Sequence, residues 1–188
     1  MPILGIMASQ ISGHLWAPSG AYDALATVTV PVGGVASVEL AGIPTGYKHL
    51  QLRMIARSSG SGGSFVSVKV NGDTTASNYA RHLLVGDGAN ATAYANVGTV
   101  TNLGKIADAS NTANVFGAFV LDILDYGSVV KNKTFRSIGG FDGNGTGEFD
   151  FNSILWMNSS TGITSMTLTE VNGYNFTANS QFALYGVK

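Results

Sequence analysis

The chain has 188 residues, of which 11% are charged, and its formal net charge is −1. An average soluble chain carries about 25% charged residues, so most of this surface must consist of uncharged side chains. The ten Lys and Arg residues form no basic run, which excludes the clustered positive surface that nucleic-acid binding requires. The absence of cysteine excludes disulfides and thiolate metal sites. Low charge with a net charge near zero favours association, so we expect a subunit of a homo-oligomer without a nucleic-acid partner.

The N-terminal stretch has no charged side chain before Asp23. Its large apolar residues are Ile3, Leu4, Ile6, Met7, Ile11, Leu15 and Trp16. It lacks the basic residues of a secretory signal, and its interrupted apolar run is too short to span a membrane, so no membrane insertion is expected. Pro18-Ser19-Gly20 has the composition of a hinge. We therefore predict an extended arm over residues 1–20, whose apolar residues form an assembly interface, and one domain over residues 21–188.

Short strands with alternating apolar residues are predicted along the first half of the chain. They cover residues 24–30, 35–40, 50–57, 65–70 and 79–85. In the third of these, Leu50, Leu52, Met54 and Ala56 share one face, Gln51, Arg53 and Arg57 share the other, and Ile55 is an exception. Asn71-Gly72 is a hairpin signal, so 79–85 is expected to pair back onto 65–70. Residues 86–114 are expected to be loops with one weak strand near 93–100.

The second half of the chain gives clearer strand signals. Residues 115–124 are almost continuously apolar, which is typical of a central strand buried on both faces. Further strands are predicted over 134–141, 149–157, 163–169 and 182–187. No long window shows the apolar stripe of a helix. The sequence therefore predicts an all-β fold, an antiparallel β-sandwich with a jelly-roll-like topology.

One loop resembles the start of a calcium-binding loop. The segment Asp142–Asp150, DGNGTGEFD, places oxygen-bearing side chains at loop positions 1, 3 and 5 and Gly147 at position 6. Position 12 would be Ser153, which cannot supply the bidentate carboxylate. Alternating Gly with Asp, Asn and Thr is also typical of a hairpin turn. We expect a turn that needs no metal, with a calcium site as the alternative.

No other constellation of residues indicates chemistry. His14, His49 and His82 are scattered and lack the clustered ligands of a metal or catalytic site. Asp122 and Asp125 are three residues apart in a predicted strand, so they should lie on opposite faces as solvated edge residues. No nucleophile elbow, phosphate loop or dinucleotide fingerprint occurs. We expect no catalytic residue, no metal site and no cofactor, and hence no enzyme.

Five stretches together resemble a group of small virion proteins of tailed bacteriophages, common among phages of aquatic bacteria. They are ILGIMASQISGHL (3–15), GIPTGYKHLQLRMIAR (42–57), VNGDTTASNYARHLLVGDG (70–88), LDILDYGSVVKNKTFRSIGGFDGNG (121–145) and ILWMNSSTGITSMTLT (154–169), with FALYGVK at the end of the chain. The order of these motifs along the chain is more specific than any one of them. The resemblance implies a structural protein of the virion and no catalytic residue.

The leading hypothesis is a capsid decoration or cement protein, located in the virion and assembled in the host cytoplasm. Its partners would be sister subunits, most simply in a homotrimer by analogy with phage decoration and fibre proteins, and other virion proteins such as the major capsid protein. The alternative is a receptor- or glycan-binding module of a tail or head fibre, which would bind a host-surface glycan through loops 58–64, 86–114 and 142–148. A glycan-cleaving enzyme is the least supported hypothesis, because no acid–base pair is found.

Overall fold

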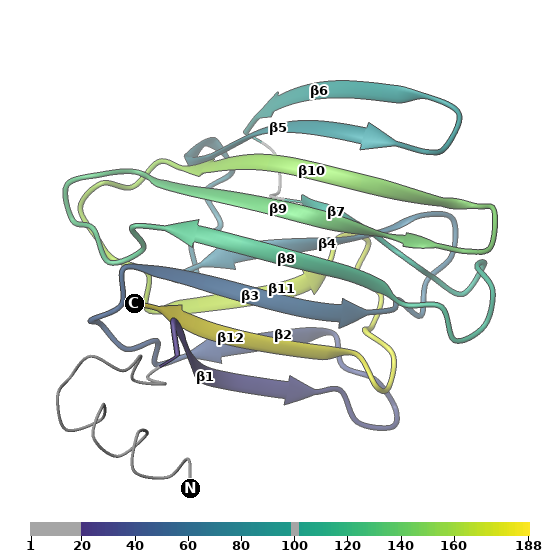
Figure 1. The fold of residues 1–188 in the computed structure, drawn as a ribbon, viewed down its shortest axis with the longest axis horizontal. Helices are drawn as coiled ribbons and strands as arrows, with labels where there is room; N and C mark the ends of the chain where they lie inside the picture. Colours follow the sequence, from purple (N-terminus) through teal and green to yellow (C-terminus); the bar gives the residue numbers. More distant parts are fainter. Residues whose placement is uncertain (1–19, 99–101) are drawn as a thin grey trace, which may run out of the picture.

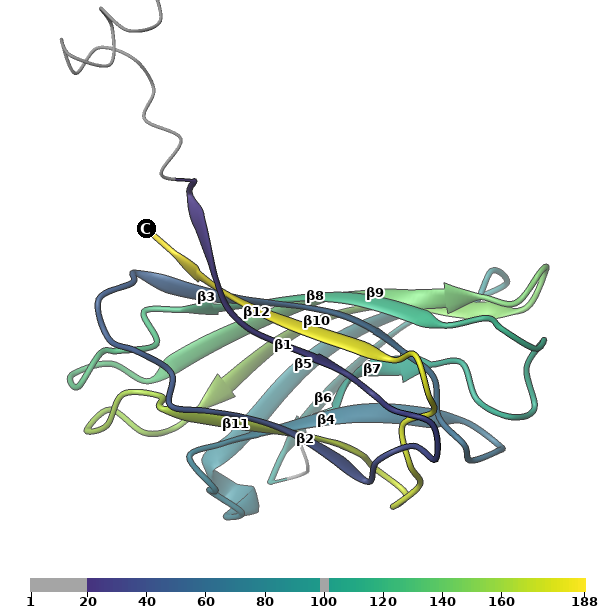
Figure 2. The same cartoon turned by 90° about the horizontal axis from the view of Figure 1, so that it is seen from below.

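The computed structural model describes residues 20–98 and 102–188, and these residues form two antiparallel sheets packed face to face (Figures 1 and 2). The predicted antiparallel β-sandwich is confirmed, and the described residues contain no α-helix. No described helix is long and apolar enough to cross a membrane. The jelly-roll topology stays a prediction. The predicted arm, with its seven apolar residues and His14, lies outside the described residues except for Gly20.

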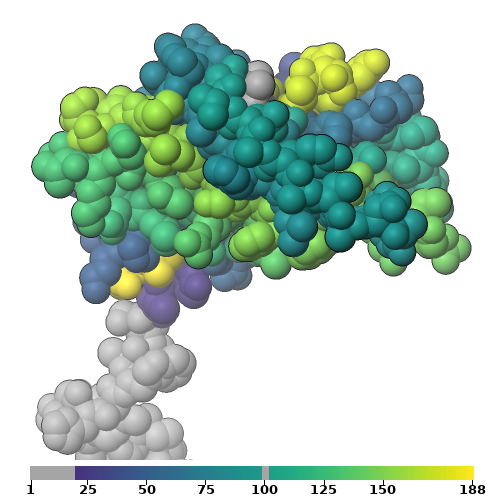
Figure 3. Space-filling view, turned by 90° about the horizontal axis from the view of Figure 1, so that it is seen from above, coloured from purple at the N-terminus to yellow at the C-terminus, as the bar shows by residue number. Residues whose placement is uncertain are grey.

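The two sheets differ in size. In spatial order, the large sheet contains β1 (Tyr22–Thr29), β12 (Gln181–Val187), β3 (His49–Ala56), β8 (Gly117–Leu124), β9 (Lys133–Asp142), β10 (Gly147–Trp156), β5 (Tyr79–Gly86) and β6 (Ala91–Val97). The small sheet contains β2 (Ser37–Ala41), β11 (Ser165–Glu170), β4 (Ser64–Val70) and β7 (Asn102–Ile106). The β5–β6 hairpin forms the edge of the large sheet opposite β1 and faces the viewer in Figure 3.

The core lies between the two sheets and is built from the alternating apolar residues of each strand. In β3, Leu50, Leu52, Met54 and Ala56 are buried, as the sequence predicts, while Arg53 and Ile55 are exposed. The largest fully buried aromatic side chains are Trp156, Tyr126, Phe135, Phe176 and Phe182. These residues come from segments far apart in the sequence, so the core exists only when both sheets are assembled.

One pairing prediction in the first half of the chain is wrong. Asn71 and Gly72 do form a tight turn, in which the Asp73 N–H donates to the Val70 carbonyl. After that turn, however, the chain passes through a 3₁₀ turn, η1 (Ala76–Asn78), and enters the other sheet. β5 therefore pairs with β10 and β6, whereas β4 pairs with β11 and β7. Within 86–114, the weak strand predicted near 93–100 corresponds to β6, and the structure contains a second strand, β7, that was not predicted.

The apolar strand 115–124 is also buried less completely than expected. β8 is a central strand of the large sheet, and its buried residues are Gly117, Phe119, Leu121 and Ile123. The alternate residues face away from the small sheet: Ala118 is exposed and Val120 is half-buried. The prediction of burial on both faces is therefore wrong for the described residues. The composition of β8 is that of a strand covered on both sides, yet one side is uncovered.

A layer of polar side chains joins β7 to the large sheet. β7 is an edge strand of the small sheet, so the main-chain groups on its free side lack strand partners. Ser137 Oγ and Asn152 Nδ2 both donate hydrogen bonds to the Leu103 carbonyl, at 2.7 and 2.8 Å. Gly104, at φ +143°, permits this approach, because a Cβ there would lie 2.3 Å from the Phe119 ring. The polar residues inside the large sheet thus complete the hydrogen bonding of a buried strand edge.

Candidate functional site

The outer face of the large sheet, which faces the viewer in Figure 1, carries large apolar side chains. Two adjacent rows of cross-strand neighbours contain them, one through Val120, Ile138, Phe151 and Leu84 and one through Ile55 and Phe149. We call these six residues the apolar face. Except for the half-buried Val120, each is between 41% and 50% exposed. Contiguous exposed apolar residues on a soluble domain mark sites of interaction.

The orientation of the side chains of β10 is the strongest indication that the apolar face is a candidate contact surface. Phe149 and Phe151 point outward, whereas Asp150 and Asn152, which alternate with them, are fully buried toward the small sheet. In a strand with one solvent-exposed face, the apolar residues usually point inward and the polar residues outward, so this arrangement is the reverse of the usual one. The polar pair is needed inside to complete the edge of β7, and the period-two geometry of the strand then places both phenylalanines outside.

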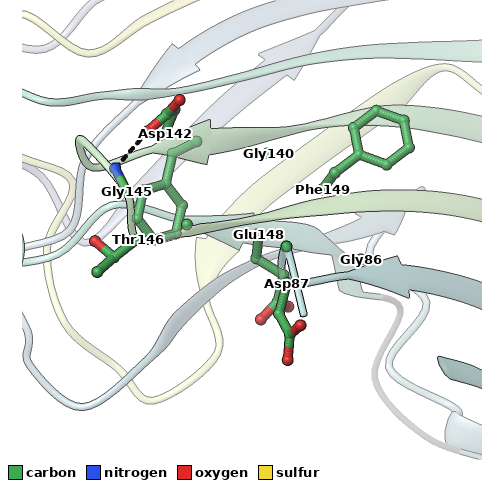
Figure 4. Close-up of a pocket in the computed structure, with 11 residues that line it drawn as sticks. Gly86, Asp87, Gly140, Asp142, Gly145, Thr146, Glu148 and Phe149 are labelled. Carbon is green, nitrogen blue, oxygen red and sulfur yellow. Dashed lines mark hydrogen bonds between the residues drawn. The ribbon is translucent and has the colours of Figure 1, made fainter. Parts of the chain in front are cut away.

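Shallow hollows lie between the side chains of this face. One, of about 540 Å³, lies beside Phe149 and is lined by Gly86, Gly140, the β9–β10 turn and the acidic residues Asp87, Asp142 and Glu148, as Figure 4 shows. Gly86 and Gly140 are the cross-strand neighbours of Phe149, so the ring has no side chain on either side of it. A second hollow, of about 390 Å³, lies between Arg53, Ile55 and Ile138. A third, of about 440 Å³, lies beside Leu84 and Phe151.

A row of polar side chains borders the apolar face. We call Gln51, Asp122, Arg136, Ser153 and His82, which are successive cross-strand neighbours, the polar row. Gln51 Nε2 donates to Asp122 Oδ1 at 2.8 Å, and Arg53 Nε donates to Gln51 Oε1 at 2.7 Å.

An aromatic–cation stack lies near the β1 edge of the same sheet, where Arg53 continues the row of Val120 and Tyr185 continues the polar row. The Arg53 guanidinium carbon lies 5.1 Å from the centre of the Tyr22 ring and 4.8 Å from the centre of the Tyr185 ring, within the range of cation–π contacts. The stack fixes Tyr22 at the start of β1 on the outer side of the sheet. The point where residues 1–19 join the described domain is therefore on the same side as the apolar face.

The outer face of the small sheet is different in character. Its central cross-strand row is Glu39, Thr167 and Lys69, and Ser67 Oγ lies 2.9 Å from Thr169 Oγ1 in hydrogen-bonding contact. This is the ordinary pattern of a strand layer with apolar residues inside and polar residues outside. The contrast makes the outer face of the large sheet the candidate interaction surface of the domain.

A second candidate site is a cleft of about 420 Å³ beneath the β5–β6 hairpin. Its lining combines the aromatic rings of Phe65 and Tyr94 with the polar groups of Arg81, Asn102 and Glu148. Arg81 donates to the Asn102 carbonyl at 3.3 Å, and Lys105 pairs with Glu148 at 2.9 Å. Burial lowers the pKa of Arg81. Rings beside hydrogen-bonding groups can hold a neutral, hydroxyl-rich ligand.

The predicted turn after Asp142 is confirmed, but it is shorter than predicted, because β10 begins at Gly147. Asp142 Oδ1 accepts hydrogen bonds from the Asn144 and Gly145 N–H groups, at 2.8 and 3.4 Å, and the second of these is drawn in Figure 4. Asn144 and Gly145 adopt positive φ angles of 66° and 92°, which Asn and Gly tolerate. The Asp142 carboxylate therefore closes the β9–β10 hairpin. Across residues 20–98 and 102–188, no three His, Asp or Glu side chains are grouped as a metal site. Calcium independence stays a prediction.

The other titratable residues singled out in the sequence are mostly apart. His82 is exposed on β5, and His49 Nδ1 accepts a hydrogen bond from the Asp125 N–H at 3.0 Å. Asp125 follows the end of β8, so the argument from strand faces does not apply to it, and it pairs with Lys131 at 2.8 Å. Asp122 lies in a central strand, which corrects the prediction of an edge position.

Sequence reasoning missed the apolar face. Two signals were available: Ile55, which breaks the alternation of its strand, and the run Phe149–Asn152, in which aromatic and polar residues alternate. Neither signal says which face is covered, so neither could have located the site without the sheet partners.

No protein-family model, curated protein or solved structure matches the chain. The geometry of the apolar face and of the cleft beneath β5–β6, together with the sequence motifs, is therefore the basis for any assignment of function.

Proposed function

We propose that the chain is a non-enzymatic structural protein of a tailed-bacteriophage virion, a capsid decoration or cement protein that works as a homo-oligomer. Two sequence properties support the proposal. The motifs between residues 3 and 169, in their order along the chain, resemble those of small phage virion proteins. The low charge of the chain favours association over a monomeric state. A trimer is the simplest closed assembly by analogy with decoration proteins.

The observation that carries the proposal is the apolar face of the large sheet. The bonds of Asp150 and Asn152 to β7 require positions 149 and 151 to point outward, but they do not require phenylalanine there, and an enzyme or a monomeric binding domain gains nothing from two exposed rings. A subunit of an assembly does, because the exposed rings become the buried centre of an interface. Apolar area removed from water contributes roughly 25 cal/mol per Å², and repetition around a closed ring multiplies each contact.

The proposal is tested on particles of a phage whose genome encodes this chain. Quantitative mass spectrometry should find hundreds of copies in each particle if the protein decorates the capsid, and a few dozen or fewer if it belongs to the tail. Particles grown without the protein should bind the purified chain when it is added back. Absence of the chain from purified particles would contradict a virion role.

A second candidate function is recognition of a host-surface glycan by a fibre module. The observation that favours it is the cleft beneath β5–β6, where Phe65 and Tyr94 stand beside Arg81 and Glu148. Tyr94 is 54% exposed, so it is available to stack on a sugar ring. Binding on a glycan array that is lost in Tyr94→Ala would support this function. The matched control is Tyr174→Ala, which removes an exposed tyrosine outside the cleft.

A further inference from the structure

A partner that covers the apolar face has to bury these side chains without bringing a charge into the contact. Val120, Ile138, Phe151 and Leu84 form an unbroken row across four strands, and the neighbouring row adds Ile55 and Phe149. None of the six can hydrogen-bond through its side chain, so a charged or strongly polar partner would lose hydration without compensation.

The chain itself contains a segment of the required chemistry. Residues 1–19 carry no charged side chain and include seven large apolar ones. This segment joins the domain at Gly20, two residues before Tyr22, which stands at the β1 edge of the same outer face. Nineteen extended residues reach at most about 63 Å, whereas the six strand spacings from β1 to β5 cover about 29 Å. The segment is therefore long enough to span the apolar face of its own or a neighbouring copy.

The polar row favours a neighbouring copy. From the Tyr22 end of β1, the direct path of a segment that folded back onto its own apolar face passes over Tyr185, Gln51 and Arg53, where the polar row reaches β12. The segment offers few polar side chains to replace the water around the Gln51 amide and the Arg53 guanidinium, so this path would be costly. A segment that arrives from a second copy can approach from the β6 side of the sheet and contact the apolar face alone.

We infer that residues 1–19 of one copy lie across the apolar face of a second copy, with apolar side chains seated in the hollows beside Ile55 and Phe151. The inference rests on the proposed role in an assembly and names the surface through which the copies associate. It gives the predicted arm a binding surface and accounts for phenylalanine, rather than a polar residue, at the outward positions Phe149 and Phe151. When such segments are exchanged around a ring, the apolar face of every copy is covered, which is the condition for a closed oligomer.

The first test compares the mass of full-length variants by light scattering over a range of concentrations. Phe151→Arg and, independently, Leu84→Lys place a charge on the apolar face, and the pair Ile6→Asp with Ile11→Asp places charges in the segment. Each should weaken association by at least about 100-fold, because a charge would be buried without a partner. Thr167→Arg, on the outer face of the small sheet, is the matched control and should keep the wild-type mass.

Melting curves and circular dichroism establish that each variant is folded, and two face variants on different strands guard against a folding defect in one of them. A folded Phe151→Arg or Leu84→Lys variant that retains the wild-type oligomer would overturn the inference. So would a wild-type chain that remains monomeric at high concentration.

The second test uses the absence of cysteine from the chain. Copies carrying Ile6→Cys are mixed with differently tagged copies carrying Ala93→Cys, which is exposed on β6 beside Leu84. Mild oxidation should yield a disulfide between the two tagged species, and Thr167→Cys in place of Ala93→Cys should yield little. A double variant that closes the disulfide only within one copy would overturn the exchange between copies.

These tests are made on the purified chain, so they are independent of the virion experiment. A chain that exchanges its segment but is absent from phage particles would refute the proposed function and leave the inference standing. A chain that decorates particles, yet keeps its oligomer when Phe151 is replaced by Arg, would refute the inference alone.

Discussion

The backbone N–H of Lys105 donates a 2.8 Å hydrogen bond to Oδ2 of Asp150, and this bond joins the edge of the small sheet to the inner face of the large one. Asp150 is fully buried, and its other carboxylate oxygen, Oδ1, has no hydrogen-bond donor among the described residues. The pairing explains the facing of β10, because Asp150 can reach β7 only if Phe149 and Phe151 point to the opposite side of the sheet.

The ionisation of Asp150 should make the fold less stable above neutral pH than in mild acid. Burial raises the pKa of this carboxyl to about 6, although the Lys105 N–H group opposes the shift. An unfolded aspartate ionises near pH 4, so stability falls as pH rises from about 4 to about 6 and the loss persists above that, in total about 3 kcal/mol. Asp150→Asn keeps an acceptor for Lys105 and removes the charge. It should raise the melting temperature at pH 8 by several degrees and leave it nearly unchanged at pH 4.

The control for Asp150→Asn is Glu39→Gln, which removes an exposed carboxylate from the outer face of the small sheet. This control should show no comparable gain at pH 8. If Asp150→Asn lowered the melting temperature equally at both pH values, the ionised carboxylate of Asp150 would not be destabilising the fold.

Replacement of Gly104 by alanine should be strongly destabilising. A Cβ at this position would lie 2.3 Å from the Phe119 ring and 2.9 Å from Asp150 Cβ, and φ is +143°. Overpacking and backbone strain together should cost about 2–4 kcal/mol in denaturant unfolding. Gly86→Ala is the matched control, because a Cβ there meets no atom within 4 Å and Gly86 also lies in a strand. Similar unfolding midpoints for the two variants would contradict close packing of β7 on the large sheet.

The buried Lys133 should hold the loop after β10 in place. Its ammonium group donates to the carbonyls of Asn158 and Thr161 and lies 5.3 Å from the centre of the Trp156 ring. Burial lowers the pKa of Lys133. Lys133→Met fills a similar volume but leaves two carbonyls without their donor, which should cost about 1–3 kcal/mol.

Hydrogen exchange reports the position of that loss. The amides of residues 158–163 should exchange faster in Lys133→Met, whereas those of β3 should change only as global stability changes. Lys131→Met, which breaks an exposed ion pair with Asp125, should leave both regions unaltered within about 0.5 kcal/mol. Unchanged exchange in 158–163 of Lys133→Met would show that the lysine does not order this loop.

Asp73 should stabilise the fold above pH 4 and lose that effect in acid. Burial by itself would raise its pKa, but hydrogen bonds from Asn78, Trp156 and Thr75 outweigh this and lower the pKa to about 2. Since the folded pKa is below the unfolded value, the contribution is full above pH 4 and disappears as pH falls toward 2. Asp73→Asn should therefore cost about 1–3 kcal/mol at pH 7 and almost nothing at pH 2. Urea unfolding at the two pH values measures the difference, and a pH-independent loss would contradict it.

Local pattern in the sequence was sufficient to predict most strands and one turn. The alternation of Leu50, Leu52 and Met54 with polar residues predicted both the strand β3 and its buried face. The alternation of Gly with Asp, Asn and Thr after Asp142 predicted the hairpin turn, in which Asn144 and Gly145 adopt positive φ. Both features depend on a few neighbouring residues, so the local sequence alone is sufficient to predict them.

Only the tertiary structure decided which strands are partners and which faces are covered. β5 was expected to pair with β4, but it pairs with β10 in the other sheet. The apolar area buried between the two sheets outweighs the local preference for a hairpin. β7 was not predicted as a strand; it pairs with β4 on one side, and Ser137, Asn152 and Asp150 bond to its other edge. The same bonds place Phe149 and Phe151 outside. A period-two sequence fixes two alternating faces, but the layer that packs against them selects the inner one, and here it selected the polar side of β10.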